Sequence, residues 1–202
     1  TNIANELADQ FKKANISAYV EPTTGNVLLD MGEDFLFKKN SYILNRRAKK
    51  TIKKIIPIYS KVLFGSSEIK DKIESFNVVG HASPTHRGRY VDPGSTNSRA
   101  YSYNMFLSAQ RASSISTYIF SSRTGKFNYK STLQRMTRSI GKGYSSPIKL
   151  KARKGRSLAS LKKKSKCKEY HCKKSQRVEL SFTLKDDIKS INDLIKMSKE
   201  NK

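Results

Sequence analysis

Acidic residues are scarce in this sequence. Its 202 residues include 41 lysines and arginines but only 16 aspartates and glutamates, which gives a formal net charge of +25 at pH 7. Such an excess favours polyanionic partners, namely nucleic acid, anionic lipid or an acidic polymer, and charge alone does not choose among them. Hydrophobic residues make up 36% and aromatic residues 9% of the chain, which supports a modest core and excludes a wholly disordered chain. The length fits one domain, with or without appendages.

Long apolar segments are also lacking. No run of 18 apolar residues occurs, so no transmembrane helix is expected, and no secretory signal pattern is present. Because the chain begins with Thr1 rather than Met, we expect it to be a fragment of a longer protein. An anchoring or export segment would then lie outside this fragment.

Signatures of catalysis are missing too. The sequence contains no glycine-rich phosphate loop, no Gly-x-Ser-x-Gly elbow and no His-Glu-x-x-His motif. Only three histidines occur, and none has an ordered acid or nucleophile as partner. We therefore expect a protein that is not an enzyme and needs no cofactor. Aromatic-rich RNA-binding signatures and zinc-finger spacings are absent as well, which disfavours nucleic acid as the partner despite the charge.

Cysteine is nearly absent, since Cys167 and Cys172 in "CKEYHC" are the only two. Two interpretations are open. The two thiols could bind a metal together with His171, and Glu169 could be a fourth ligand, but the common structural zinc spacings are not present and no second ligand pair lies elsewhere. A disulfide between Cys167 and Cys172 is favoured in an oxidising compartment, and we expect no metal site. The disulfide would pin the basic segment that precedes the last predicted strand.

The segments that are present alternate between helical and strand-like patterns. Helical periodicity predicts four helices, and strand-like runs predict a hairpin followed by three further strands. Pro57 should kink or end the second helix. Two strand–helix–strand crossovers in a mixed sheet predict an α/β sandwich with helices packed on one face. The predicted helices are 5–16, 45–64, 101–121 and 186–198, and the predicted strands are 16–21, 26–31, 75–83, 133–144 and 177–184.

Two segments between these elements predict loops. Residues 84–100 are rich in Pro, Gly, Ser and Arg, which is typical of a long loop. Residues 149–176 form a low-complexity basic insert with the sequence "KLKARKGRSLASLKKKSK" near its start. We expect this insert to be solvated and mobile.

The predicted helix 101–121 carries one arginine at the edge of its apolar face. On a helical wheel of about 100° per residue, Asn104 and Arg111 lie two turns apart on nearly the same line, beside an apolar stripe. A guanidinium that is shielded from water needs an anionic or carbonyl partner, and its planar fork suits a carboxylate. Two partners are open for Arg111: an acidic residue of this chain, or a carboxylate supplied from outside.

Four motifs in order give the chain a resemblance to a known family. They are the strand "FNVVGHAS", the spacing N-x-x-L-S-x-x-R-A from Asn104 to Ala112, the turn "GKGYSSPI" and the strand "QRVELSF". Together they make the chain resemble the OmpA C-terminal domain family, which includes the periplasmic part of the flagellar stator protein MotB. The preceding "NISAYVEPTTGNVLLDMGEDFLF" is similar to the lead-in of MotB-like members. The resemblance implies a two-layer α/β sandwich over residues 25–184, with a lead-in over 1–24, the insert at 149–176 and a helical tail over 185–202.

The resemblance also implies a function. The family binds peptidoglycan without covalent chemistry, so we expect the periplasmic domain of a membrane-anchored protein, anchored to the cell wall and acting as a homodimer. The inner membrane is favoured as the anchor over the outer membrane, and a flagellar stator, a porin-type parent and a lipoprotein all remain open. The alternative is a scaffold with a degenerate wall site that binds another polyanion, nucleic acid or lipopolysaccharide, through its basic insert.

Individual site residues follow from the same resemblance. The family arginine that matches Arg111 holds a carboxylate of diaminopimelate in the stem peptide, the asparagine that matches Asn104 orders the site, and Leu107 belongs to the same motif. The family aspartate that takes the diaminopimelate ammonium is replaced here by Ser83, which can accept a hydrogen bond but cannot neutralise charge. We therefore expect Asp92 to fold back towards Arg111, either as a substitute carboxylate or as an internal partner that occupies it.

Three further residues carry open interpretations. Arg177 matches an arginine before the last strand of the family and would line the same pocket or pair with Glu179. His81 is interpreted as a structural histidine within the sheet. His86 is interpreted as an ordinary loop residue.

Overall fold

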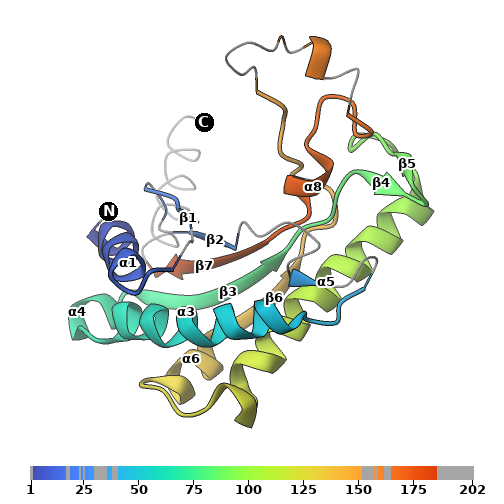
Figure 1. Cartoon of the computed structure of the whole chain (residues 1–202). Coiled ribbons are helices and arrows are strands. Elements are labelled where there is room, and N and C mark those ends of the chain that lie inside the picture. Colours follow the sequence, from blue (N-terminus) through green and yellow to red (C-terminus); the bar gives the residue numbers. More distant parts are fainter. Residues whose placement is uncertain are drawn as a thin grey trace, which may run out of the picture.

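The structure is a computed structural model, and it describes residues 2–16, 19–22, 24, 26–29, 36–37, 41–151, 157, 159–161 and 165–185. Helices and strands alternate along most of this chain (Figure 1). The helical elements are α1 (Asn2–Lys13), α3 (Arg46–Phe64), α4 (Ser67–Lys70), α5 (Ser98–Phe120), the 3-10 helix η1 (Ser122–Thr124), α6 (Lys130–Met136) and α8 (Cys172–Ser175). The strands are β1 (Tyr19–Val20), β2 (Val27–Leu29), β3 (Ile73–Gly80), β4 (Thr85–His86), β5 (Arg89–Tyr90), β6 (Thr137–Gly141) and β7 (Val178–Leu184).

Five strands form one mixed sheet in the order β1-β2-β7-β3-β6. Strands β3 and β6 are parallel, and the other neighbouring pairs are antiparallel. Because β2 and β3 both run antiparallel to β7, they run parallel to each other, and α3 connects them. Helix α5 connects β3 to β6 in the same way. The predicted hairpin, both crossovers and the mixed sheet are therefore confirmed.

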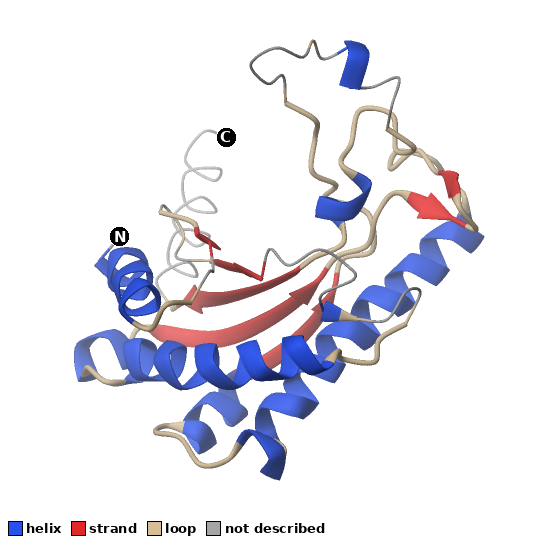
Figure 2. Ribbon diagram, viewed as in Figure 1, coloured by secondary structure: helices blue, strands red, loops and turns tan. Residues whose placement is uncertain are grey.

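The main core lies between the sheet and the helices α3 and α5, which cover one of its faces (Figure 2). Phe76 and Val78 of β3 point into this core, where the ring of Phe76 lies 5.3 Å from the ring of Tyr59 on α3. Side chains alternate along a strand, so Ser75 and Asn77 point to the opposite face. There Ser75 Oγ donates to Asn77 Oδ1 and Asn77 Nδ2 donates to Thr183. The predicted α/β fold with helices on one face is confirmed.

Two local predictions need correction. Of the two outcomes predicted for Pro57, an end of the helix does not occur, because α3 continues through it. The exposed Lys53 lets water satisfy the carbonyl that proline cannot bond, while Ile55 and Tyr59 are fully buried around it. The predicted strand 133–144 begins with a helix, α6, since Leu133 alone is buried among exposed polar neighbours, and the strand starts only at Thr137.

The two predicted loops also contain structure. Residues 84–100 include a two-stranded sheet of β4 and β5. The basic insert is paired at its base: Lys149 at its start bridges to Tyr170 near its end, and α8 follows. The predicted helix over 186–198 lies outside the described residues.

Candidate binding site

The four motif segments meet at the end of β3. The backbone N–H of His81 donates to the carbonyl of Arg177 at 2.9 Å, and that of Ala82 donates to the carbonyl of Gly143 at 2.7 Å. The N–H of Gly143 in turn donates to Oγ of Ser108 on α5 at 2.9 Å. The end of β3, the start of β7, the turn after β6 and the middle of α5 are thus joined by hydrogen bonds. Motifs spread over about 100 residues of sequence form one local unit.

A cleft of about 320 Å³ opens beside this unit. The β4–β5 hairpin forms one wall, the first half of α5 forms the other, and Gln176 closes one end. The cleft combines amide, guanidinium and aromatic groups, which suits a polar ligand with an apolar part. Its lining residues are Thr85, His86, Arg87, Gly88, Tyr103, Asn104, Leu107 and Gln176.

Asn104 and Ser83 hold the wall of the cleft together. Asn104 is 3% exposed, and its Nδ2 donates to the carbonyls of Thr85 at 3.0 Å and Ala100 at 2.9 Å, which fixes the hairpin to α5. Ser83 is 2% exposed, and its Oγ lies 2.8 Å from the hydroxyl of Thr85 and accepts from Nε2 of Gln176 at 3.0 Å. Asn104 and Leu107 line the cleft as well, whereas Ser83 lies behind the lining.

Arg111 is more deeply buried than its place on the helical wheel indicates. Its exposed fraction is 2%, its Nε donates to the carbonyl of Ser41 at 3.1 Å, and its guanidinium carbon lies 5.1 Å from the centre of the Phe37 ring. Arg111 follows the cleft residue Leu107 by one helical turn, about 6 Å along the axis. Arg111 is therefore not among the residues that line the cleft, and the carbonyl of Ser41 already occupies its Nε.

Asp92 does not take the place predicted for it. Its carboxylate is exposed and accepts a hydrogen bond from the N–H of Gly94 at 2.9 Å, in a turn just before α5. Arg111 lies about 20 Å further along that helix than its first residue, Ser98. The expectation that Asp92 folds back to Arg111 is wrong, because the carboxylate caps its own turn at the other end of α5.

Arg177 pairs with Glu179, the second of its two predicted alternatives. Arg177 Nε lies 2.7 Å from Glu179 Oε1, and Nη1 donates to the carbonyl of Ser146 at 3.2 Å. Since the flanking Val178 and Leu180 point into the core, Glu179 points to the sheet face opposite α5. Arg177 therefore does not line the cleft.

His81 shares this polar group on the opposite face. It is 2% exposed, and its Nε2 lies 3.3 Å from Glu179 Oε1 without the angle of a hydrogen bond. Burial lowers the pKa of His81 and outweighs the nearby carboxylate. Burial alone would raise the pKa of Glu179, but His81 and Arg177 outweigh it and lower that pKa from 4.5 to about 2. We therefore expect a neutral histidine beside a charged carboxylate at pH 7.

The sequence analysis missed several residues of the cleft. His86 is no ordinary loop residue, because its ring lies 5.4 Å from that of Tyr103 and it lines the cleft. Arg87 stands at the tip of the hairpin with a positive φ of 50°, followed by Gly88. Gly88 was the only signal in "THRGRY" for a two-residue turn, and it is weak because the flanking residues do not alternate.

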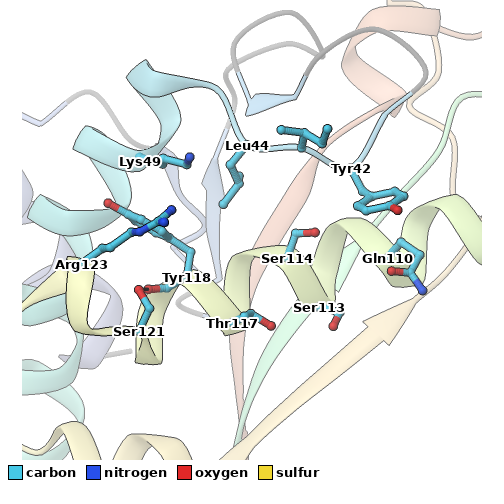
Figure 3. A pocket seen from close by; sticks show the side chains of 11 residues that line it. Tyr42, Leu44, Lys49, Gln110, Ser113, Ser114, Thr117, Tyr118, Ser121 and Arg123 are labelled. Carbon is cyan, nitrogen blue, oxygen red and sulfur yellow. Dashed lines mark hydrogen bonds between the residues drawn. The ribbon is translucent and has the colours of Figure 1, made fainter.

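A further groove, of about 610 Å³, lies further along α5 (Figure 3). Tyr42, Leu44 and Lys49 reach it from one side, and Gln110, Ser114 and other side chains of α5 from the other. It contains none of the predicted site residues, so its size does not make it the better candidate. The segment that carries Tyr42 also carries Ser41, and it separates this groove from Arg111.

The cysteines form the predicted disulfide, with an S–S distance of 1.99 Å between Cys167 and Cys172. Both thiols are therefore used, and the metal-binding alternative for them is not realised. The described part of the chain holds no group of three or more His, Cys, Asp or Glu side chains arranged for a metal ion. Within the same residues, no helix is long and apolar enough to cross a membrane.

Comparison with known proteins gives structural neighbours only. No protein-family model matches the chain, and no curated protein matches it. Among solved structures, the chain is similar to the periplasmic domain of Helicobacter pylori MotB, with 16% identity over 90% of this chain and 97% of that one and a TM-score of 0.47. It is also similar to the cell wall anchor of the T6SS from Pseudomonas aeruginosa, with 15% identity over 91% and 97% of the two chains and a TM-score of 0.46. At these values, neither family membership nor function follows from the likeness.

Proposed function

We propose that this chain binds peptidoglycan without covalent chemistry, in the cleft between the β4–β5 hairpin and the first half of α5. The observation that supports the proposal is the convergence of the four motif segments beside one cleft. The N–H of Gly143 bonds Ser108, the amide of Asn104 holds the hairpin, and Gln176 reaches Ser83. Segments that are far apart in the sequence thus meet beside a single polar cleft, which suits the binding of a polar ligand.

The ligand group proposed for Arg111 is a carboxylate of diaminopimelate in the stem peptide. A carboxylate that replaces the Ser41 carbonyl on the guanidinium forms a charge-assisted hydrogen bond, about twice as strong as a neutral one. A planar guanidinium suits a carboxylate held by two parallel hydrogen bonds, so the ligand would have to exchange with the partners that Arg111 has within the chain. Binding would therefore move Ser41 and Phe37 away from Arg111, and Asn104 and Leu107 would form the floor beneath the peptide.

This chain offers the ammonium of diaminopimelate a weaker partner than the aspartate of the family that it resembles. Ser83 is buried and bonded to Thr85 and Gln176, so it offers no charge to the ligand. Recognition should depend on the carboxylate of the ligand and much less on its ammonium. Two modified stem peptides separate these contributions in competition with purified sacculi. Amidation of the diaminopimelate carboxylate should abolish competition, whereas acetylation of its amine should leave competition largely intact.

Sedimentation with purified sacculi tests the proposed cleft. Asn104→Leu keeps the branched shape and the number of side-chain heavy atoms but loses the hydrogen bonds to Thr85 and Ala100 and the polar floor, and we expect about tenfold weaker retention. Arg135→Ala removes an exposed charge on α6 far from the cleft and is the control. Retention is compared at about 0.15 M and 0.5 M salt, because added salt screens non-specific attraction between the basic chain and the wall. Equal retention of both variants would contradict the proposal.

The setting of the whole protein is proposed on the same basis. A wall-binding domain acts in the periplasm, as part of a protein that is anchored in a membrane, with the inner membrane favoured, and it works as a non-enzymatic homodimer. Light scattering of the purified chain measures its mass directly. A monomer mass at high protein concentration would contradict the dimer. Stronger binding to DNA than to sacculi at physiological salt would favour the alternative polyanion-binding function.

A further inference from the structure

A second cavity, of about 570 Å³, is lined by the β4–β5 hairpin and by residues at the start of α5. We call it the arginine pocket. It shares His86 and Arg87 with the cleft, and its other residues belong to it alone. None of the described side chains that line it is acidic. Its lining residues are His86, Arg87, Arg89, Tyr90, Val91, Asn97 and Arg99.

The three guanidinium groups of this pocket have no ion-pair partner among the described acidic residues. Burial raises the pKa of Tyr90, and the nearby carboxylates of Asp92 and Glu169 raise it further. Neither carboxylate is part of the lining, and that of Asp92 accepts a hydrogen bond from the N–H of Gly94. Arg99 also stands in the first turn of α5, which contains no acidic residue. Since the start of a helix carries partial positive charge, a cation there is unfavourable. The charges of the pocket therefore repel one another and attract an anion.

Arg87 also has a backbone conformation that is unfavourable for a residue with a long side chain. Arg87 and Gly88 have φ values of 50° and 77°, which is the geometry of a two-residue turn that prefers Asn-Gly. A long side chain in the left-handed region costs roughly 1 kcal/mol, and such strain is concentrated at functional sites. Arg87 and Arg99 thus both occupy positions that local stability disfavours, and both line the same cavity.

We propose that the arginine pocket binds a sugar phosphate, as a site distinct from the peptidoglycan cleft. The guanidinium forks match phosphate oxygens in bidentate geometry, and three of them can surround one phosphate group. The cavity is large enough to admit the sugar as well, and the rings of Tyr90 and His86 provide faces on which it stacks. The ammonium of Lys168 lies 4.6 Å from the centre of the Tyr90 ring, which adds positive charge at the rim. A phosphorylated glycan would therefore be held next to the stem peptide.

Titration calorimetry with glucosamine 6-phosphate tests the arginine pocket. Arg89→Ala combined with Arg99→Ala removes two guanidinium groups without touching the cleft, and we expect at least about tenfold weaker binding. Arg46→Ala combined with Arg47→Ala is the matched control, because it removes two exposed arginines from the start of α3. Equal loss in both double variants would show that net charge alone is responsible and would overturn the proposal. Absence of binding by the unmodified chain would also overturn it.

Two further probes test the sugar and phosphate contributions separately. N-acetylglucosamine should not bind measurably, and inorganic phosphate should bind about tenfold more weakly than the sugar phosphate. Equal affinity for inorganic phosphate would overturn the proposal that the sugar is recognised.

Arg87→Asn should raise the melting temperature, because Asn tolerates the left-handed turn, and should weaken sugar-phosphate binding. Unchanged binding by this variant would count against the arginine pocket.

Two variants test the cleft and the arginine pocket independently, because each should weaken binding at one site only. The Arg89/Arg99 double variant should keep its sacculus retention at about 0.5 M salt, where long-range attraction is screened. Asn104→Leu should keep its affinity for glucosamine 6-phosphate, because Asn104 does not line the arginine pocket. Loss of sugar-phosphate binding in Asn104→Leu would show that the two sites are one and would overturn the proposal.

Discussion

Gly80, the last residue of β3, lies directly against the backbone carbonyl of Ser108 on α5, and a Cβ on Gly80 would overlap that oxygen. Gly141, the last residue of β6, lies against the backbone of Ala109, and a Cβ on Gly141 would come within 2.7 Å of its nitrogen. These two glycines let α5 approach the sheet where the motif segments meet. The separation between helix and sheet beside the cleft is therefore set by residues that have no side chain.

Gly80→Ala should destabilise the protein by about 2 kcal/mol or more, because a methyl group would have to push α5 away from β3. Gly94→Ala is the matched control, since the nearest atom to its Cβ would be Oδ1 of Asp92 at 3.5 Å. The control should change the free energy of unfolding by less than about 0.5 kcal/mol. Urea denaturation measures both values. Similar values for the two variants would contradict the close contact between Gly80 and Ser108.

Tyr59→Phe should stabilise the protein. The Tyr59 side chain is fully buried, burial raises the pKa of its hydroxyl, and that hydroxyl has no hydrogen-bond partner in the described structure. Removal of an unsatisfied buried hydroxyl should gain about 1 kcal/mol, or roughly 2–4 °C in Tm for a chain of this size. Tyr129→Phe, at an exposed ring, is the control and should leave Tm unchanged. A lower Tm for Tyr59→Phe would show that the hydroxyl has a partner in solution.

Stability should fall in acid because of the polar group around Glu179. The folded-state pKa of Glu179 is lowered from 4.5 to about 2, so its contribution is complete above pH 4.5 and is lost as pH falls towards 2. The pKa of His81 is lowered from 6.5, so its contribution is lost as pH falls below 6.5. Protonation of either side chain in acid therefore lowers the free energy of unfolding.

Glu179→Gln tests this pH dependence. At pH 7 the variant should be less stable by about 1–2 kcal/mol, a value reduced for partial solvent screening, and the difference should vanish as pH falls towards 2. Glu68→Gln, at an exposed pair with Lys72, should show no difference at any pH. Thermal melts between pH 2 and pH 7 give the comparison. A constant difference between wild type and Glu179→Gln would contradict the lowered pKa.

Reduction of the disulfide should loosen the end of the basic insert without unfolding the domain. The bond between Cys167 and Cys172 closes a short loop, for which the chain-entropy estimate is about 2 kcal/mol. Hydrogen exchange should become faster at the N–H of His171, which bonds the carbonyl of Ile148. Exchange in β3 should stay slow. A global loss of protection on reduction would show that the disulfide stabilises the whole fold.

The elements that the sequence predicted correctly are those with long periodic patterns. Helices α3 and α5 bury one side of a regular repeat, and strand β7 alternates, so the pattern alone indicates them, while β3 is a nearly continuous buried run. The hairpin of β4 and β5 was missed because each strand has only two residues and its turn places Arg87 where local preference favours Asn or Gly. Helix α6 was missed because one buried leucine gives no periodicity.

The site was predictable only where its geometry is local. The helical wheel placed Asn104, Leu107 and Arg111 on one side of α5, and the structure keeps them there. It could not show the depth of Arg111, since the residues that cover it, Phe37 and Ser41, lie about 70 residues away in the sequence. The pairing of Arg177 with Glu179 likewise depends on which face of β7 is buried.

The affinity of Arg111→Lys for purified sacculi tests the central claim most directly. Lysine keeps the charge in its buried place but lacks the planar fork that holds a carboxylate with two hydrogen bonds. The account predicts about tenfold weaker binding of Arg111→Lys than of wild type or Arg135→Ala, at about 0.5 M salt, with a Tm within a few degrees of wild type. Wild-type affinity in a folded Arg111→Lys protein would contradict the account, because the guanidinium would then have no part in wall binding.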